Sequence, residues 1–263
     1  MDIGILGCGT LGRTLAKGLA AHPRVSRIVA STKSKRTRFE GLPDVIALEE
    51  NRELASVSDV IVLCVKPAQL EAVVREIAGE LRPETLLISA AASVETARIA
   101  QWTASATPIV RAMPNTPCRI GAGMTAIAAG PHALPAHLEL AAELFAMLGR
   151  VCTVEERLMD AVTAMSGCGP AYGYLIVEAL ADAGVMLGLP RAIAVELAAQ
   201  TLYGAGAMIL ASDAHPAALK DEVTTPAGCT IAALLAFEAG GLRSTLARGV
   251  AAAAHAARTP SYS

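Results

Sequence analysis

A glycine-rich turn directly after an apolar run is the feature that most constrains how this chain can fold. The run DIGIL (2–6) is followed by GCGTLG, which puts Gly7, Gly9 and Gly12 in GxGxxG spacing before a helical pattern over 10–21. Gly7 permits a tight turn, Gly9 lets a pyrophosphate approach the backbone, and Gly12 lets the helix pack on the strand. The N–H groups and the dipole of that helix end favour phosphates. Strand, glycine loop and helix in this order predict a dinucleotide-binding βαβ unit rather than a packing turn alone.

Short apolar, β-branched runs recur through the first half of the chain and predict a parallel sheet. Most are apolar throughout, as expected of strands covered on both faces, and helical patterns separate them. The expected strands are 2–6, 27–31, 59–65, 85–91, 108–113, 124–129 and 150–154, and the expected helices are 10–21, 68–82, 94–102 and 135–148. Strand, helix, strand indicates parallel βαβ units. We therefore expect an α/β Rossmann-type dinucleotide-binding domain over residues 1–154.

The strand pattern ends near residue 155, and alanine and leucine then dominate. Glycine or proline separates helices of roughly 10 to 20 residues. The breaks fall at 166–172, 188–190, 215–216 and 224–228. The stretch GYLIVEALADAGVMLGL is too apolar for one solvated surface helix. We expect residues 155–263 to form an all-helical dimerisation and substrate-binding domain, through which the chain forms an obligate homodimer.

Charge and composition exclude several classes of partner. The formal net charge of the 263 residues is −2, and aromatic residues make up 3% of them, so neither a nucleic acid nor an anionic membrane is expected as a partner. The six cysteines lack zinc-ligand spacing, and the histidines show no i, i+4 pair, so we expect reduced thiols and no metal. The N-terminus lacks a basic n-region, and no uninterrupted apolar run reaches roughly 18 residues. We expect a soluble cytoplasmic protein.

The residues after the second expected strand bear on which dinucleotide binds. A fold that prefers NAD usually places Asp or Glu about 20 residues after the glycine loop, where it accepts a hydrogen bond from the ribose 2′-hydroxyl. This chain instead reads STKSKR from Ser31, through Thr32 and Lys33, with no carboxylate until Glu40. Hydroxyls and cations suit a 2′-phosphate, which favours NADPH and leaves NADH as the alternative. A solvated basic loop would have the same composition.

Two further loops follow expected strands at the carboxyl edge of the sheet. CVKP (64–67) follows the third strand, where a parallel sheet meets its ligand, and Lys66 is expected to line the cofactor crevice. RAMPNTP (111–117) holds two prolines that restrict the backbone around Asn115 and Thr116. We interpret this as a rigid loop that presents an amide and a hydroxyl beside the nicotinamide.

Three long stretches together resemble one family, the pyrroline-5-carboxylate reductases. They are VRAMPNTP (110–117), AVTAMSGCGPAYGYLIVEALADAGVMLGLPR (161–191) and HPAALKDEVTTPAGCTIAALLAFE (215–238). The resemblance implies a Rossmann domain followed by a helical dimerisation domain. It also implies reduction of L-1-pyrroline-5-carboxylate to L-proline with NAD(P)H, in homodimers or rings of five dimers, and a position for Asn51 near the adenine ribose. The chain departs from the family pattern at Thr32-Lys33, and at Ala227 and Cys229, which replace a glycine and a threonine.

The turn TTPAGCT (224–230) interrupts an alanine-rich helical region and is the expected substrate site. The substrate that the resemblance implies is a small cyclic imine with a carboxylate. Pro226 and Gly228 shape the turn, and Thr225 is expected to cap the helix that follows. The N–H groups near Cys229 and Thr230 lie at the start of this helix and can hold the carboxylate. Thr230 Oγ would form a hydrogen bond with the ring nitrogen. If Ala227 adopts a positive φ, the turn is strained. Simple helix capping is the alternative role of the threonines.

The predicted site residues fall into three groups. The catalytic residue is Thr230, and the substrate-binding residues are Thr225, Gly228, Cys229, Thr230 and Asn115. The cofactor-binding residues are Leu6, Gly7, Cys8, Gly9, Thr10, Leu11, Gly12, Ser31, Thr32, Lys33, Asn51, Cys64, Val65, Lys66, Pro67, Met113 and Pro114. Two other functions stay open. One is a β-hydroxyacid dehydrogenase, which needs a catalytic lysine in the helical half, where Lys220 is the candidate. The other is a non-catalytic NADP sensor.

Overall fold

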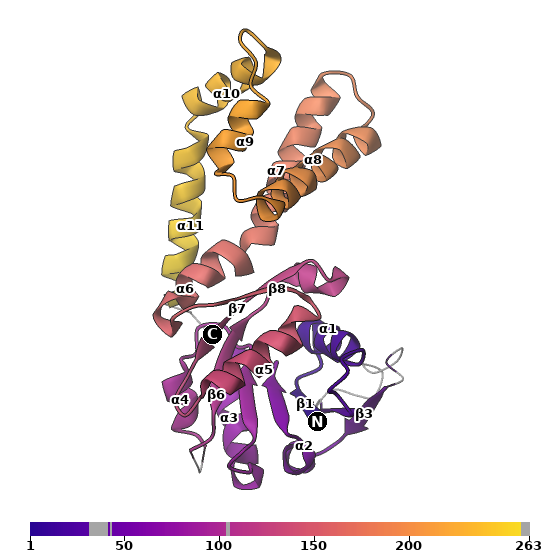
Figure 1. Cartoon of the computed structure of the whole chain (residues 1–263), viewed down its shortest axis with the longest axis vertical. Coiled ribbons are helices and arrows are strands. Elements are labelled where there is room, and N and C mark those ends of the chain that lie inside the picture. The colour runs from indigo at the N-terminus through magenta and orange to yellow at the C-terminus, as the bar shows by residue number, and fades with distance from the viewer. Residues whose placement is uncertain (32–41, 43, 104–105, 259–263) are drawn as a thin grey trace. The chain divides into compact units, whose positions relative to one another are not determined.

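The computed structural model describes residues 1–31, 42, 44–103 and 106–258. The chain divides into two compact units (Figure 1). The first comprises Met1–Cys168 and Ala253–Ser263, and the second comprises Gly169–Ala252. The contact boundary therefore lies after Cys168, because residues 155–168 pack with the sheet-containing unit. The domain boundary at residue 154 stays a prediction.

The first unit is built on one eight-stranded sheet in the order β3-β2-β1-β4-β5-β6-β7-β8. The strands are β1 (Asp2–Leu6), β2 (Arg27–Ser31), β3 (Val45–Leu48), β4 (Val60–Leu63), β5 (Leu86–Ser89), β6 (Ile109–Met113), β7 (Gly123–Ala129) and β8 (Gly149–Thr153). Strands β1 to β6 are parallel, β7 is antiparallel to β6, and β8 is parallel to β7. The Rossmann-type prediction is confirmed, and the seven predicted strands are present.

The strand β3 is the one that the sequence reading missed. It is four residues long, lies at the sheet edge, and leaves Ile46 48% exposed. An edge strand pairs on one side only and does not need the continuous apolar pattern of a central strand. The four residues VIAL are nevertheless continuously apolar, so the signal that predicted the other strands is present here, although the strand is only half-buried.

Helices cover both faces of the sheet and create two apolar cores. The helices of this unit are α1 (Thr10–Leu19), α2 (Asn51–Val57), α3 (Pro67–Ile77), α4 (Thr96–Ala100), α5 (Pro135–Ala146) and α6 (Met159–Val162). One core contains Ile3 and Ile5 of β1 with Leu15 of α1 and Phe145 of α5. The other contains Leu6 with residues of α2 and α3. Neighbouring side chains of a strand point to opposite faces, which is why β1 contributes to both cores.

The second unit is entirely helical in the residues that the structure describes. Its helices are α7 (Gly169–Met186), α8 (Arg191–Ala211), α9 (Pro216–Glu222), α10 (Cys229–Ala239) and most of α11 (Leu242–Arg258). The predicted breaks are confirmed: Gly188 has φ +94, Pro190 is the N-cap of α8, and Pro216 begins α9. A left-handed φ favours glycine, so the turn between α7 and α8 is encoded locally.

This helical unit leaves an unusual amount of apolar surface uncovered. Met186 and Leu187 are each 81% exposed, and Tyr203 is 67% exposed. Among its described residues, the buried apolar side chains are Ala181, Ala194 and Ala198. By length and composition, α8 is long and apolar enough to cross a membrane, which the sequence reading did not anticipate. Exposed apolar surface on this scale indicates an interface that a single chain does not complete.

Candidate functional site

The loop after β1 has the geometry of a phosphate-binding glycine turn. Gly7 has φ +98, and a Cβ there would lie 2.8 Å from the carbonyl carbon of Cys64. Gly9 is the N-cap of α1, and a Cβ built on it would meet nothing within 4 Å. The protein therefore excludes a side chain at Gly7 and leaves the space beside Gly9 open. Helix α1 begins at this open space and has no acidic residue in its first turn.

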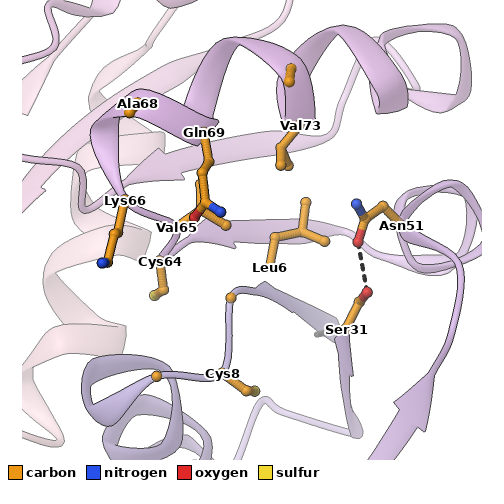
Figure 2. A pocket seen from close by; sticks show the side chains of 13 residues that line it. Leu6, Cys8, Ser31, Asn51, Cys64, Val65, Lys66, Ala68, Gln69 and Val73 are labelled. Carbon is orange, nitrogen blue, oxygen red and sulfur yellow. Dashed lines mark hydrogen bonds between the residues drawn. The ribbon is translucent and has the colours of Figure 1, made fainter. Parts of the chain in front are cut away.

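A cavity of about 610 Å³ opens over this loop at the carboxyl ends of β1, β2 and β4 (Figure 2). Its lining residues are Leu6, Gly7, Cys8, Gly9, Ser31, Asn51, Cys64, Val65, Lys66, Ala68, Gln69, Ala72 and Val73. The sequence reading named the first nine of these and missed the four from α3. Their spacing of three and four residues marks one face of a helix, which is the signal that could have revealed them.

The loop CVKP connects β4 to α3 beside the glycine turn. Lys66 is the N-cap of α3 with extended backbone, and Pro67 occupies the first helical position, which proline favours. Lys66 is the one charged side chain among the described residues that line the cavity. Burial raises the pKa of the Cys64 thiol, and the nearby Cys8 raises this pKa further. Cys64 is therefore a neutral lining group.

Ser31 and Asn51 meet at one end of the cavity, as Figure 2 shows. Ser31 Oγ donates to Asn51 Oδ1 over 2.6 Å, and Asn51 Nδ2 donates to Glu76 Oε2 over 2.9 Å. Asn51 is the first residue of α2, a helix that the sequence reading did not predict. The predicted cofactor residues Thr32 and Lys33 lie outside the described residues.

A second cavity, of about 270 Å³, lies against four further predicted cofactor residues, Thr10, Leu11, Met113 and Pro114, whereas Gly12 and Pro67 line neither of these two cavities. Its lining residues are Thr10, Leu11, Thr14, Ala90, Met113, Pro114, Asn115, Thr116, Cys118, Arg119 and Gly167. The loop after β6 thus approaches the start of α1, as a shared carboxyl edge requires. Thr14, Ala90, Cys118, Arg119 and Gly167 were not predicted as site residues. A Cβ at Gly167 would lie 2.5 Å from Met113 Cε, so a larger residue here would displace the end of the Met113 side chain.

Both functional groups of the Asn115 amide bond to the protein itself. Oδ1 accepts from the N–H of Met124 at 2.9 Å, and Nδ2 donates to the carbonyl oxygen of Ser166 at 3.2 Å. Asn115 therefore ties the β6 loop to β7 and to the π-helical turn Thr163–Gly167. Its structural role is to form these hydrogen bonds to Met124 and Ser166. Its role in substrate binding stays a prediction.

These two cavities fit a dinucleotide by their own chemistry. The glycine turn offers unobstructed backbone N–H groups at a helix start, and Ser31 and Asn51 offer polar atoms at the end of the first cavity. The second cavity is mainly apolar and borders the same helix start, as a planar ring system requires.

The predicted substrate turn lies in the second unit, before α10. Ala227 has φ +56, so the strain considered for this alanine is present. Gly228, and not Thr225, is the N-cap of α10, so the capping role expected for Thr225 is wrong. A Cβ at Gly228 would lie 2.3 Å from Thr225 Oγ1, which explains the glycine. Cys229 is exposed and Thr230 is half-buried in the first turn, whose N–H groups have no acceptor within the helix.

Two family models match the chain. The model described as pyrroline-5-carboxylate reductase dimerisation matches residues 156–259. The model described as NADP oxidoreductase, coenzyme F420-dependent, matches residues 2–93, which include the glycine turn and the CVKP loop. The dimerisation match begins where the strand pattern ends, and residues 94–155 lie between the two matches.

Several relatives that match almost the whole chain are pyrroline-5-carboxylate reductases. The pyrroline-5-carboxylate reductase of Pisum sativum is 38% identical over 97% of this chain and 94% of its own length. That of Synechocystis is 42% identical over 96% of each. A pyrroline-5-carboxylate reductase structure from Coxiella burnetii matches with TM-score 0.92 and 34% identity over 99% of this chain and 98% of that one. A Plasmodium falciparum pyrroline carboxylate reductase with NADP bound matches with TM-score 0.87 and 31% identity over 98% and 97%.

Proposed function

The chain belongs to the pyrroline-5-carboxylate reductase family, and we infer from this that it reduces L-1-pyrroline-5-carboxylate to L-proline with NAD(P)H. The observation that carries this function is the joint presence of two elements. One is the open glycine turn over the larger cavity, and the other is the helical half that matches the family along its length. A sensor that only bound NADP would need the first element and not the second.

The first cavity supports the choice of cofactor. The backbone N–H groups after Gly7 and Gly9 would hold the pyrophosphate, and Ser31 and Asn51 would contact the adenosine ribose. The relative from Plasmodium falciparum binds NADP, and we propose NADPH as the main cofactor, with NADH accepted. Reduced nicotinamide supplies a hydride when it is bound.

The turn before α10 is the proposed substrate site. The N–H groups at Cys229 and Thr230 would hold the substrate carboxylate, because a helix N-terminus favours an anion. The hydroxyl of Thr230 would accept a hydrogen bond from the protonated ring nitrogen. An imine that enters already protonated needs no general acid, and the chain's task is then to orient the imine carbon and to exclude water.

Self-association follows from the same half of the chain. The match to the dimerisation model and the exposed apolar side chains of α7 and α8 support a homodimer. A dimer that covered part of this exposed apolar surface would also account for the apolar character of α8. Assembly into a ring of five dimers and a cytoplasmic location are further proposals, and light scattering at several protein concentrations tests the first.

A direct assay tests the proposed function. Purified protein is mixed with pyrroline-5-carboxylate and either NADPH or NADH, and the loss of absorbance at 340 nm is followed. We expect substrate-dependent oxidation of the cofactor with proline as the product. Binding of NADPH without turnover would favour the sensor. Loss of turnover with intact cofactor binding in Lys220→Ala would favour the dehydrogenase class.

A further inference from the structure

Two hydrogen-bonded side chains, supported by a third from α3, lie at one end of the larger cavity. Ser31 is 2% exposed and Asn51 is 7% exposed, and both line the cavity. Glu76 of α3 does not line it. The carboxylate of Glu76 accepts from Asn51, and Asn51 accepts from Ser31. Glu76 therefore acts on the cavity through Asn51 and not by direct contact.

The carboxylate determines the direction of both hydrogen bonds. An ionised carboxylate only accepts, so Asn51 must turn its NH₂ group toward Glu76 and its carbonyl oxygen toward Ser31. The Ser31 hydroxyl has one proton, and that proton is engaged by Asn51. Ser31 can then offer only lone pairs to a ligand in the cavity. A group that binds beside Ser31 must be a hydrogen-bond donor.

This polarity bears on the 2′ position of the cofactor. Ser31 is the last residue of β2, where this fold contacts the adenosine ribose. A ribose 2′-hydroxyl can donate to Ser31 Oγ, whereas a 2′-phosphate offers acceptor oxygens and negative charge. Lys66, the charged side chain among the described lining residues, lies on the far side of the cavity from Ser31 in Figure 2.

Resting on the proposed function, we propose that Glu76 is a positioning residue for cofactor selectivity. By orienting Asn51 and Ser31, it favours a ribose 2′-hydroxyl and weakens the preference of the site for the 2′-phosphate. Glu76→Gln removes this constraint, because an amide can present either its oxygen or its NH₂ group to Asn51. The glutamine amide can donate to the Asn51 carbonyl, and the Asn51 NH₂ group can then donate to Ser31 Oγ. The Ser31 proton becomes available to a phosphate oxygen.

The test measures binding of two probes to the protein without turnover. The probes are 5′-AMP and adenosine 2′,5′-bisphosphate, which differ only at the 2′ position, and calorimetry gives both dissociation constants. We expect Glu76→Gln to shift their ratio about tenfold toward the 2′-phosphate, the value of about one hydrogen bond. NADH and NADPH should shift in the same sense.

A matched control separates hydrogen-bond direction from charge. Glu71 lies on the same helix α3 and pairs with Arg75 at 2.9 Å, away from the cavity lining. Glu71→Gln removes the same charge and should leave the ratio unchanged within about twofold, because exposed charges are screened. An equal shift in both variants would overturn the positioning role.

A second variant covers the case in which Glu76→Gln does not fold. Ser31→Ala removes the acceptor and should weaken 5′-AMP more than the bisphosphate, whereas an equal loss for both probes contradicts the proposal. Wild-type protein that binds neither NADPH nor NADH would refute the proposed function. Normal binding with an unmoved ratio in a folded Glu76→Gln protein would refute this inference alone.

Discussion

Gly12 packs directly on the carbonyl oxygen of Gly7: a Cβ at residue 12 would lie 2.2 Å from that oxygen. The two glycines hold α1 against the end of β1, which keeps the first helical N–H groups at the cavity. Gly9, between them, has open space where a Cβ would project. The three glycines of one motif are therefore required for different reasons, and substitutions can separate them.

Gly12→Ala should destabilise the protein itself. A methyl group there forces the backbone of α1 away from Gly7, and overpacking of this kind costs about 2 to 3 kcal/mol of the free energy of unfolding. Urea denaturation at fixed protein concentration measures the loss. A variant as stable as the wild type would show that the close contact relaxes freely.

Gly9→Ala should spare stability and impair binding. The backbone at Gly9, with φ −73, is accessible to alanine, and the added methyl group meets no protein atom, so unfolding should change by about 1 kcal/mol or less. The methyl group would occupy the space of the phosphates, and the dissociation constant of NADPH should rise at least about tenfold. Calorimetric titration with NADPH measures this dissociation constant, and an unchanged affinity would contradict the prediction.

Thr230→Ala should lower kcat/KM about tenfold, roughly the value of one hydrogen bond to the reacting imine. The affinity for NADPH should stay constant. Thr245→Ala is a suitable control, because Thr245 is an exposed hydroxyl on α11, outside the substrate turn. Steady-state kinetics with pyrroline-5-carboxylate gives both values, and an unchanged kcat/KM would remove Thr230 from the proposed mechanism.

Ala227→Gly should stabilise the protein. Ala227 has φ +56, a left-handed conformation that costs an alanine about 1 kcal/mol more than a glycine. The gain should appear as a higher urea midpoint with an unchanged slope. A lower midpoint would mean that the greater entropy of glycine in the unfolded chain outweighs the relief of strain.

The Cys64 thiol should make the free energy of unfolding of the protein fall at high pH. Its folded pKa is raised by burial and by Cys8, so above the ordinary value of 9.0 the unfolded thiol ionises while the folded one stays protonated. Stability is then fully present below pH 9 and declines as the pH rises, by up to about 1.4 kcal/mol per pH unit. Cys64→Ala should flatten this decline between pH 9 and 10.5, and identical slopes would refute it.

Much of this protein is readable because its signals are local. The GxGxxG spacing, the apolar runs of the central strands and the glycine and proline breaks of the helical half each act within a few residues. They predicted the Rossmann-type sheet, the start of α1, the turn at Gly188 and the beginning of α10. The many apolar residues of the helical half likewise predicted that this half associates with a second copy of the chain.

The tertiary structure decided what depends on neighbours distant in sequence. Helix α2 packs in one core with residues of α3, and the reversed direction of β7 is shown only by its pairing with β6. The amide of Asn115 is engaged by Met124 and Ser166, which no spacing rule connects to it. Glu76 orients Asn51 from another helix. Hydrogen-bond direction depends on which groups meet in space, and that is set by packing.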